Sequence, residues 1–309
     1  MNTVTKIKVI GVGGSGSNAI SRMARCDIRG VELVAVNTDA QDLMKTNADL
    51  KLRIGRRITQ GLGTGMNPEI GKKSALENRQ EISEILKGSD MVFITCGLGG
   101  GTGTGAAPVI AEVAKTLGIL TLAVVTKPFS FEGQVRMRMA ENGQRRLKEN
   151  VDTLISISND KLLSTLDPKT PLINAFWVCD DVLRQAVQGI SDLIMLPGII
   201  NVNFADIKTI MQNAGSALFG VGKAQGEGRA EKAALAAINS PLLDISIKGA
   251  KGILFNVSGG KDISLSEIDE VAKVITREIN PEAKIIFGAV QDEKLKEGEI
   301  KVTVIATGF

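Results

Sequence analysis

The sequence predicts an α/β protein with a doubly wound, mostly parallel N-terminal domain, a long central helix and a smaller α+β domain. In the first half, short β-branched apolar runs alternate with stretches of helical periodicity, which is typical of βαβ units. Residues 171–197 then form one long amphipathic segment, and the remaining residues alternate strands and helices at shorter intervals. We therefore expect domains at 1–170 and 198–309, with a spine helix at 171–197 between them.

Each expected element follows a local pattern. Apolar runs predict strands in the N-terminal domain at 6–11, 31–36, 91–96, 120–126 and 153–158. Between them we expect a helix beginning at Asn18 and helices at 69–86, 108–117 and 134–149. About 25 residues make the central helix roughly 37 Å long. In the C-terminal domain, strands are expected at 217–222, 252–258, 283–289 and 299–306, with helices near 230–239 and 264–279.

The composition argues against several classes of protein. The 309 residues include no histidine, which excludes His-containing triads and the usual imidazole metal sites. Three distant cysteines without a CxxC pair are typical of reduced thiols. A net charge of +3 without a basic block, together with 3% aromatics, gives little support for nucleic-acid binding. Because no apolar run approaches the ~18 residues of a membrane span, we expect a cytoplasmic protein without direct membrane binding.

Three glycine-rich turns in the first half point to a phosphate ligand. Gly11-x-Gly13-x-x-Gly16 lies between a strand and a helix, where backbone N–H groups can meet a phosphate. Alone, this motif also fits a dinucleotide fingerprint, with Asp39 as the ribose-binding acid, or a tight turn without a ligand.

The second and third turns favour a triphosphate. Residues 97–105 contain six glycines with Thr102 and Thr104, a composition suited to a nest for anionic oxygens. The third turn, residues 61–69, would close over a terminal phosphate. No GxxxxGK[ST] motif is present, which excludes the P-loop mechanism with its phosphate-binding lysine.

These turns and five further segments resemble the tubulin/FtsZ family of cell-division GTPases. GLGGGTGTG resembles the tubulin signature, and the others follow in family order: GVGGSGSNA, VNTDAQ, GLGTGMNPEIG, KPFSFEG, SNDKLL, VLRQAVQGISDLI and NVNFADIKTIM. The resemblance covers essentially the whole chain. It implies a GTPase that assembles head to tail into filaments, hydrolyses GTP where two subunits meet, and organises prokaryotic cell division at a mid-cell ring.

The resemblance also implies a nucleotide site. The first two turns would cradle the phosphates, Glu132 and Arg136 would contact the sugar, and Phe176 would lie beside the base. Asn18, Asn159 and Asp180 fall on the guanine-recognising positions. A buried carboxylate accepts from the N1 and N2 donors of guanine, whereas adenine presents an acceptor at N1, so ATP is rejected. The full set is Gly13, Gly14, Ser15, Gly16, Ser17, Asn18, Asn37, Thr64, Gly65, Gly99, Gly100, Gly101, Thr102, Gly103, Thr104, Glu132, Arg136, Asn159, Phe176 and Asp180.

From the residues alone, several members of this set also fit purely structural roles without a ligand. Glu132 and Arg136 also fit a solvated i,i+4 pair. Asp180 inside a long helix would ordinarily face solvent, and Phe176 would ordinarily belong to the core.

The segment with Asn201, Asn203 and Asp206 resembles the family's catalytic loop, which acts on the nucleotide of the neighbouring subunit. Such a head-to-tail contact does not close and therefore generates a filament. The family usually has aspartate where this chain has Asn203, and commonly has alanines at Thr64 and Met66. An amide orients water but supplies no charge, so we expect slow hydrolysis. We expect GTP or GDP with Mg²⁺, and K⁺ as a further candidate cation, and we assign no direct metal ligand to the protein.

The resemblance also concerns partners, and two alternative functions remain open. The family binds membrane-tethering division proteins through a C-terminal peptide after a variable linker, and neither is found in these 309 residues. One alternative is a tubulin-like GTP-binding assembly or regulatory protein with little hydrolysis, which Asn203 favours. The other is a dinucleotide-binding oxidoreductase using Gly11 to Gly16, which would leave the second glycine turn without a role.

Overall fold

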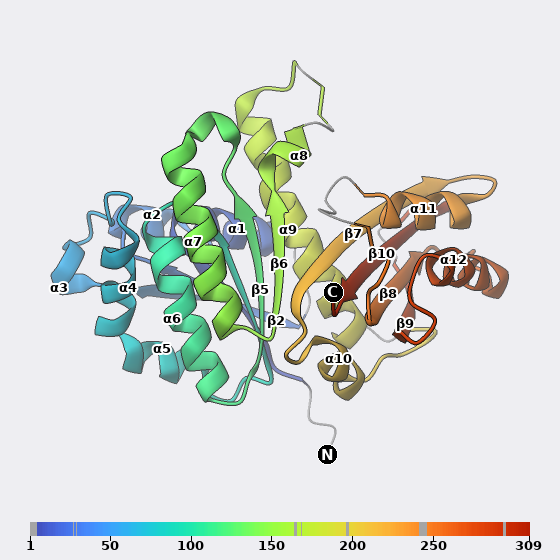
Figure 1. Ribbon diagram of the computed structural model, residues 1–309, viewed down its shortest axis with the longest axis horizontal. Helices are drawn as coiled ribbons and strands as arrows, with labels where there is room; N and C mark the ends of the chain where they lie inside the picture. Colours follow the sequence, from blue (N-terminus) through green and yellow to red (C-terminus); the bar gives the residue numbers. More distant parts are fainter. Residues whose placement is uncertain are drawn as a thin grey trace. The chain divides into compact units, whose positions relative to one another are not determined.

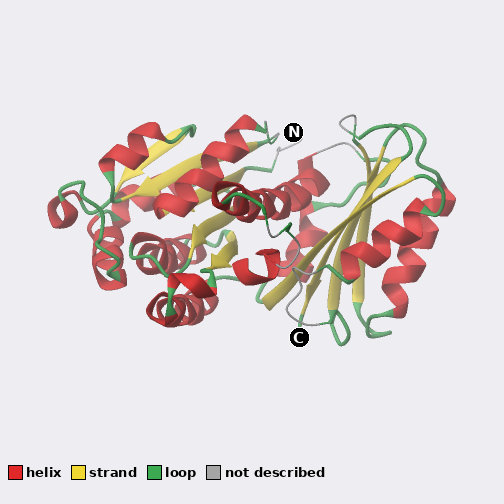
Figure 2. Ribbon diagram, turned by 90° about the horizontal axis from the view of Figure 1, so that it is seen from above, coloured by secondary structure: helices red, strands yellow, loops and turns green. Residues whose placement is uncertain are grey.

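The computed structural model describes residues 5–26, 28, 30–163, 166–167, 169–195, 198–240, 246–292 and 295–309. The chain divides into two compact units, Met1–Gln188 and Gly189–Phe309 (Figure 1). The first is a parallel sheet with helices, and the second is a mostly antiparallel sheet with helices (Figure 2). The predicted fold class is therefore confirmed.

The sheet of the first unit reverses its strand order at its first strand. The strands are β1 (Ile7–Val12), β2 (Val31–Asn37), β3 (Leu50–Arg53), β4 (Met91–Gly97), β5 (Leu120–Lys127) and β6 (Thr153–Ser158). They run in parallel in the order β3-β2-β1-β4-β5-β6. Because β1 lies between β2 and β4, the crevice beyond the carboxyl ends of β1 and β4 is the topological switch point, where ligands of such folds bind.

Helices fill the connections of this unit. They are α1 (Gly13–Arg25), α2 (Ala40–Lys45), α3 (Arg56–Thr59), α4 (Pro68–Glu77), α5 (Arg79–Leu86), α6 (Thr102–Thr116), η1 (Ser130–Glu132), α7 (Gln134–Asn150), α8 (Asn159–Leu163) and α9 (Leu172–Met195). The inner faces of α4, α5, α6 and α7 pack against the strands in one apolar core. The long helix predicted from the amphipathic segment is confirmed as α9.

Two predicted helices begin several residues earlier in the structure. Helix α1 begins at Gly13 and not at Asn18, because the glycine motif itself forms its first turn. Helix α6 begins at Thr102, so Pro108 lies inside it. The glycines at its start also serve packing, because a Cβ at Gly105 would lie 1.9 Å from the carbonyl oxygen of Pro68 in α4.

The helix expected at 69–86 is two helices that meet at Asn78. The side-chain oxygen Oδ1 of Asn78 accepts from the backbone N–H of Gly55 at 2.8 Å, and the side-chain nitrogen Nδ2 donates to Glu81 Oε1 at 2.5 Å. These bonds favour the break over a continuous helix. The elements β3, α2 and α3 were not predicted, because each is too short for its residue pattern to show a period.

The second unit contains the last residues of α9 and its own sheet. Its helices are α10 (Phe204–Met211), α11 (Arg229–Ile238) and α12 (Leu265–Arg277). The strands β7 (Gly215–Gln225), β8 (Gly252–Gly259), β9 (Lys284–Gln291) and β10 (Glu299–Thr307) lie in the order β7-β10-β8-β9, with β10 antiparallel to both neighbours. Helices α11 and α12 pack on the sheet around a second apolar core. Among the described residues, no helix has the length and apolar character needed to cross a membrane.

Candidate nucleotide-binding site

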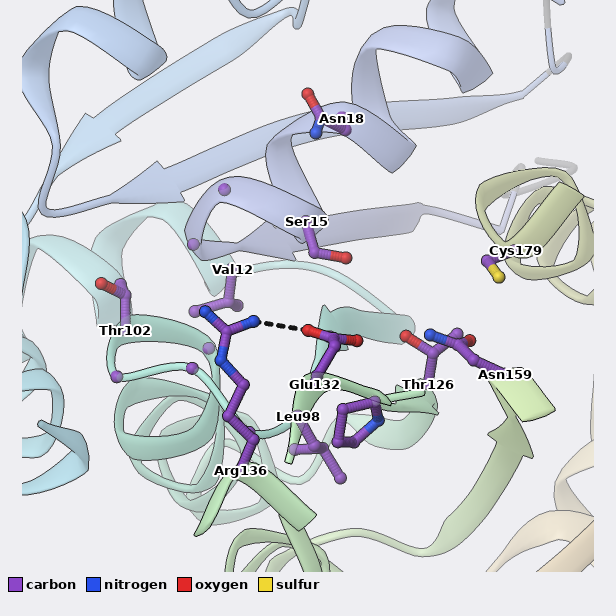
Figure 3. A pocket seen from close by; sticks show the side chains of 18 of the residues that line it. Val12, Ser15, Asn18, Leu98, Thr102, Thr126, Glu132, Arg136, Asn159 and Cys179 are labelled. Atoms are coloured by element: carbon purple, nitrogen blue, oxygen red, sulfur yellow. Dashed lines mark hydrogen bonds and ion pairs between the residues drawn. The ribbon is translucent and has the colours of Figure 1, made fainter. Parts of the chain in front are cut away.

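A cavity of about 370 Å³ opens at the switch point of the first unit. Figure 3 shows Thr102 towards one end of it and Asn159 with Cys179 towards the other. Most of the predicted nucleotide residues line it: Gly13, Gly14, Ser15, Asn18, Thr64, Gly99, Gly100, Gly101, Thr102, Gly103, Glu132, Arg136, Asn159, Phe176 and Asp180. Six further residues line the cavity without having been predicted as site residues: Val12, Gly97, Leu98, Thr126, Pro128 and Cys179. The first three and Pro128 lie within family-like segments but carry no polar side chain, whereas Thr126 and Cys179 lie outside those segments.

Five predicted residues do not line this cavity: Gly16, Ser17, Asn37, Gly65 and Thr104. Several of them support the loops from behind. The Thr104 hydroxyl accepts from the backbone N–H of Gly99 at 2.9 Å and so closes the second glycine turn. The buried amide of Asn37 donates to Ser17 at 3.5 Å and to Asp42 at 2.7 Å.

One end of the cavity is built to receive anionic oxygens. Helices α1 and α6 both begin there, and neither N-cap residue, Val12 or Gly101, makes a side-chain capping bond. The first N–H groups of a helix lack partners within the helix and carry its positive dipole end. Two such N-termini at one cavity form a site for phosphates.

Gly100 shows that this end leaves room for a ligand. A Cβ at Gly100 would meet no protein atom within 4 Å, and the residue is outside the left-handed region. Neither packing nor backbone strain within the described chain therefore requires glycine at this position. By contrast, a Cβ on neighbouring Gly101 would lie 2.1 Å from Thr64 Oγ1 and 2.8 Å from the Asn67 nitrogen. Packing therefore explains glycine at residue 101, whereas nothing within the described chain explains glycine at residue 100.

The third glycine turn is tied to the second by hydroxyl groups. Thr102 Oγ1 lies 2.7 Å from Thr38 Oγ1 and 3.4 Å from Thr64 Oγ1. Met66 has a positive φ of 62° and does not line the cavity, and its sulfur accepts from Arg136 at 3.8 Å. Met66 therefore contacts the predicted sugar region and does not crowd the phosphate end.

Glu132 and Arg136 form an ion pair in which the carboxylate is held by a second hydrogen bond, while 38% of the Arg136 side chain remains exposed. Glu132 Oε2 accepts from Arg136 at 2.5 Å, and Oε1 accepts from the backbone N–H of Phe129 at 2.9 Å (Figure 3). Only 16% of the Glu132 side chain is exposed. Phe129 in turn packs edge-on against Phe176, with ring centroids 5.2 Å apart.

The other end of the cavity carries acceptors. Asn159 is buried, and its Oδ1 has no hydrogen-bond partner among the described residues. Burial raises the pKa of the Asp180 carboxyl to about 6, although the nearby Arg22 guanidinium opposes the rise. Burial also raises the pKa of the Cys179 thiol to about 12, so it remains neutral. A ligand that donates several N–H groups suits this end.

The predicted catalytic residues lie together in the second unit. Asn201, Asn203 and Asp206 are exposed around the start of α10, of which Asn203 is the N-cap. Asn201 Oδ1 accepts from the backbone N–H of Gly198 at 2.7 Å, whereas Asn203 makes no side-chain capping bond. In the described part of the chain, no group of three or more His, Cys, Asp or Glu side chains is arranged to hold a metal ion.

Comparisons with known proteins agree with this geometry. Residues 6–167 match the GTPase domain of the Tubulin/FtsZ family, and residues 215–309 match the FtsZ family C-terminal domain. An empty FtsZ dimer from M. jannaschii is 50% identical over 100% of this chain and 89% of its own, with a TM-score of 0.95. The W319Y mutant of FtsZ from M. jannaschii is also 50% identical, over 98% of this chain and 91% of its own, with a TM-score of 0.94.

A GTPγS-bound CetZ2 protofilament from Haloferax volcanii shares the fold at 20% identity, with a TM-score of 0.82 over 98% of this chain and 92% of its own. These matches do not support the oxidoreductase alternative. The chain belongs to the tubulin/FtsZ family, and it is a guanine-nucleotide-binding GTPase of that family.

Proposed function

We propose that this protein assembles head to tail into GTP-dependent filaments and hydrolyses GTP where one subunit meets the next. The observation that carries the proposal is the cavity, which has two uncapped helix N-termini at one end and the acceptors Asp180 and Asn159 at the other. Residues 1–170 would bind the nucleotide, the helix at 171–197 would connect the domains, and residues 198–309 would activate the neighbouring subunit. The FtsZ relative from M. jannaschii, described as a dimer, supports self-association.

The residues of the cavity have distinct roles in this proposal. Backbone N–H groups of the first two glycine turns bind the phosphates, and Thr64 lies near the terminal one. Glu132 and Arg136 bind the sugar. Asp180 accepts from guanine N1–H and N2–H, while Asn18 and Asn159 bind the remaining polar edge, beside the ring of Phe176. This set of acceptors discriminates against ATP, because adenine has an acceptor at N1.

Hydrolysis would be completed by the loop of a second subunit. Asp206 orients the attacking water and accepts its proton as the bond from the water oxygen to the γ-phosphorus forms and the bond to the bridging oxygen of GDP breaks. Asn201 and Asn203 hold that water through their amides. Mg²⁺, with K⁺ as a further candidate, would neutralise phosphate charge. Since no carboxylate cluster is found in the described chain, it would be held mainly by phosphate oxygens and water.

The cellular setting follows from the family. We propose a cytoplasmic protein of the mid-cell division ring. Asn203 supports a second candidate function, a GTP-binding filament or regulatory protein with little hydrolysis, because the loop carries one carboxylate where the family usually carries two.

A mixing experiment tests the shared site. Asp206→Ala subunits keep an intact cavity, and Gly100→Asp subunits keep an intact loop but place a negative charge in the phosphate cradle. Each variant alone should release phosphate slowly, and the mixture should recover turnover in pelletable filaments. A mixture no faster than the sum of its parts, or a rate per subunit independent of concentration, would contradict a site completed by the neighbour.

A further inference from the structure

Arg22 lies behind the predicted guanine-binding carboxylate and outside the nucleotide cavity. Arg22 lines a second cavity of about 780 Å³, formed by the end of α1 and the start of α9, which shares Asn18, Phe176 and Asp180 with the first. Arg22 Nη2 donates to Asp180 Oδ2 at 3.3 Å, across 158 residues of sequence. Asp180 lines both cavities, whereas Arg22 lines only the second. Arg22 can therefore affect the predicted base-binding end of the first cavity through its contact with Asp180.

Trp177 holds the Arg22 guanidinium in place. Arg22 Nη1 donates to the backbone carbonyl oxygen of Trp177 at 3.0 Å, and the guanidinium carbon lies 4.5 Å from the centre of the Trp177 ring. A cation on an aromatic face gains further attraction when it is partly desolvated, and only 20% of the Arg22 side chain is exposed. The guanidinium is thus fixed from two directions, with one N–H group directed at Asp180.

We propose that Arg22 is a positioning residue for guanine specificity: it keeps the Asp180 carboxylate ionised and oriented towards the nucleotide cavity. This inference rests on the proposed role of Asp180 in binding guanine. A carboxylate with two oxygens has about four acceptor positions, so Asp180 serves Arg22 and the two guanine donors together. Without the guanidinium, burial alone acts on Asp180, and a protonated carboxyl presents an O–H donor where guanine also presents a donor.

Other charged groups do not replace Arg22. Glu132 and Arg136 pair with each other, and Asp181 accepts from Arg184 and Gln185. Burial raises the pKa of Asp180, and within the described part of the chain the Arg22 guanidinium is the charged group that lowers it. The remaining titratable side chains that line the two cavities are Arg25, Cys26 and Cys179.

The test measures the ratio of ATP to GTP dissociation constants between pH 5 and pH 9 for four proteins: wild type, Arg22→Gln, Asp180→Asn and the double variant. Phosphate titration affects both nucleotides and cancels in the ratio. An opposite charge at this distance changes a carboxyl pKa by roughly 1–3 units. Arg22→Gln should therefore move the midpoint of its pH profile upwards by about 1–3 units. From a starting pKa of about 6, that shift lowers the ionised fraction of Asp180, and with it the preference for GTP, roughly 2- to 90-fold at pH 7. Arg22→Lys should restore most of the preference.

The double variant separates positioning from direct contact. In the Asp180→Asn background, Arg22→Gln should change nothing further, and a further loss would mean that Arg22 touches the nucleotide itself. An unchanged ratio and midpoint in a folded Arg22→Gln protein would overturn the inference and leave Arg22 as a link between two helices. Should Arg22→Gln not fold, Trp177→Leu decides instead, with a smaller upward shift expected and no shift overturning the inference. If Asp180→Asn retains the GTP preference, the guanine assignment in the proposed function is wrong.

Discussion

Gly100 and Gly101 are adjacent glycines for which the structure predicts opposite effects of the same substitution. Neither has a positive φ, so alanine meets no left-handed strain at either position. The added methyl group at Gly100 has no protein atom within 4 Å, whereas at Gly101 it meets Thr64 Oγ1 at 2.1 Å and the Asn67 nitrogen at 2.8 Å. Thr64 can rotate away, but the Asn67 backbone is fixed because Asn67 caps α4.

The magnitudes follow from these surroundings. Gly100→Ala restricts the unfolded chain and should stabilise the free protein by about 0.4–1 kcal/mol. In the nucleotide cavity, the same methyl group should displace a phosphate from at least one backbone N–H. A hydrogen bond to a charged group contributes about 1.5–3 kcal/mol, so GTP should bind roughly 10- to 150-fold more weakly. Gly101→Ala overpacks the loop and should destabilise the free protein by about 1–3 kcal/mol.

Two measurements separate the effects. Thermal unfolding of nucleotide-free protein should give Gly100→Ala a midpoint at or above wild type, and Gly101→Ala a midpoint several degrees lower, at about 2–4 °C per kcal/mol. Equilibrium binding of GTP should then show the loss for Gly100→Ala in a fully folded protein. A Gly100→Ala protein with wild-type affinity would refute the phosphate cradle, and a Gly101→Ala protein with a wild-type midpoint would refute the packing argument.

Three further predictions follow. Burial raises the pKa of Asp180 to about 6, and the proposed guanine contact requires the ionised carboxylate. The preference for GTP over ATP should therefore fall by up to about tenfold per pH unit below pH 6. A constant preference between pH 5 and 8 contradicts the assignment of Asp180 to guanine. Asn203→Asp should raise steady-state phosphate release by roughly tenfold in fully assembled samples and leave GTP affinity unchanged. This pattern is expected of an interaction that is made only in the transition state. Equal turnover in both proteins would leave Asp206 as the sole catalytic carboxylate. Burial raises the pKa of Cys96 and Cys179 to about 12, so both thiols remain protonated and unreactive at pH 8. Mass spectrometry should show that iodoacetamide modifies both cysteines only after the protein unfolds. Rapid modification in the native protein would show that the thiols are accessible.

The sheet and the position of the first two glycine turns could be predicted from the sequence for a physical reason. The apolar runs of β1 and β4 lead directly into glycine turns, and the carboxyl ends of parallel strands meet at one edge of a sheet. The base end was less accessible from residue patterns, because Asp180 alone fits a solvent-facing helix position and only the family resemblance indicated otherwise. Arg22 was missed altogether, since its partners lie on another helix and depend on the tertiary fold. The run of six glycines at 97–105 was interpreted as a whole as a sign of a ligand, yet Gly105 within it lets α6 pack against α4.

The structure of α10 does not explain why residue 203 is asparagine and not the aspartate usual in the family. As the N-cap of α10, Asn203 occupies a position at which asparagine and aspartate stabilise a helix about equally. Its side chain makes no capping bond, so the helix within this chain gives no reason to prefer the amide. Asp206, one turn further, keeps its carboxylate exposed on the same segment. The choice of amide at residue 203 therefore acts on whatever the loop meets outside its own unit, and in the proposed filament that is the terminal phosphate of the neighbouring subunit's nucleotide and its attacking water.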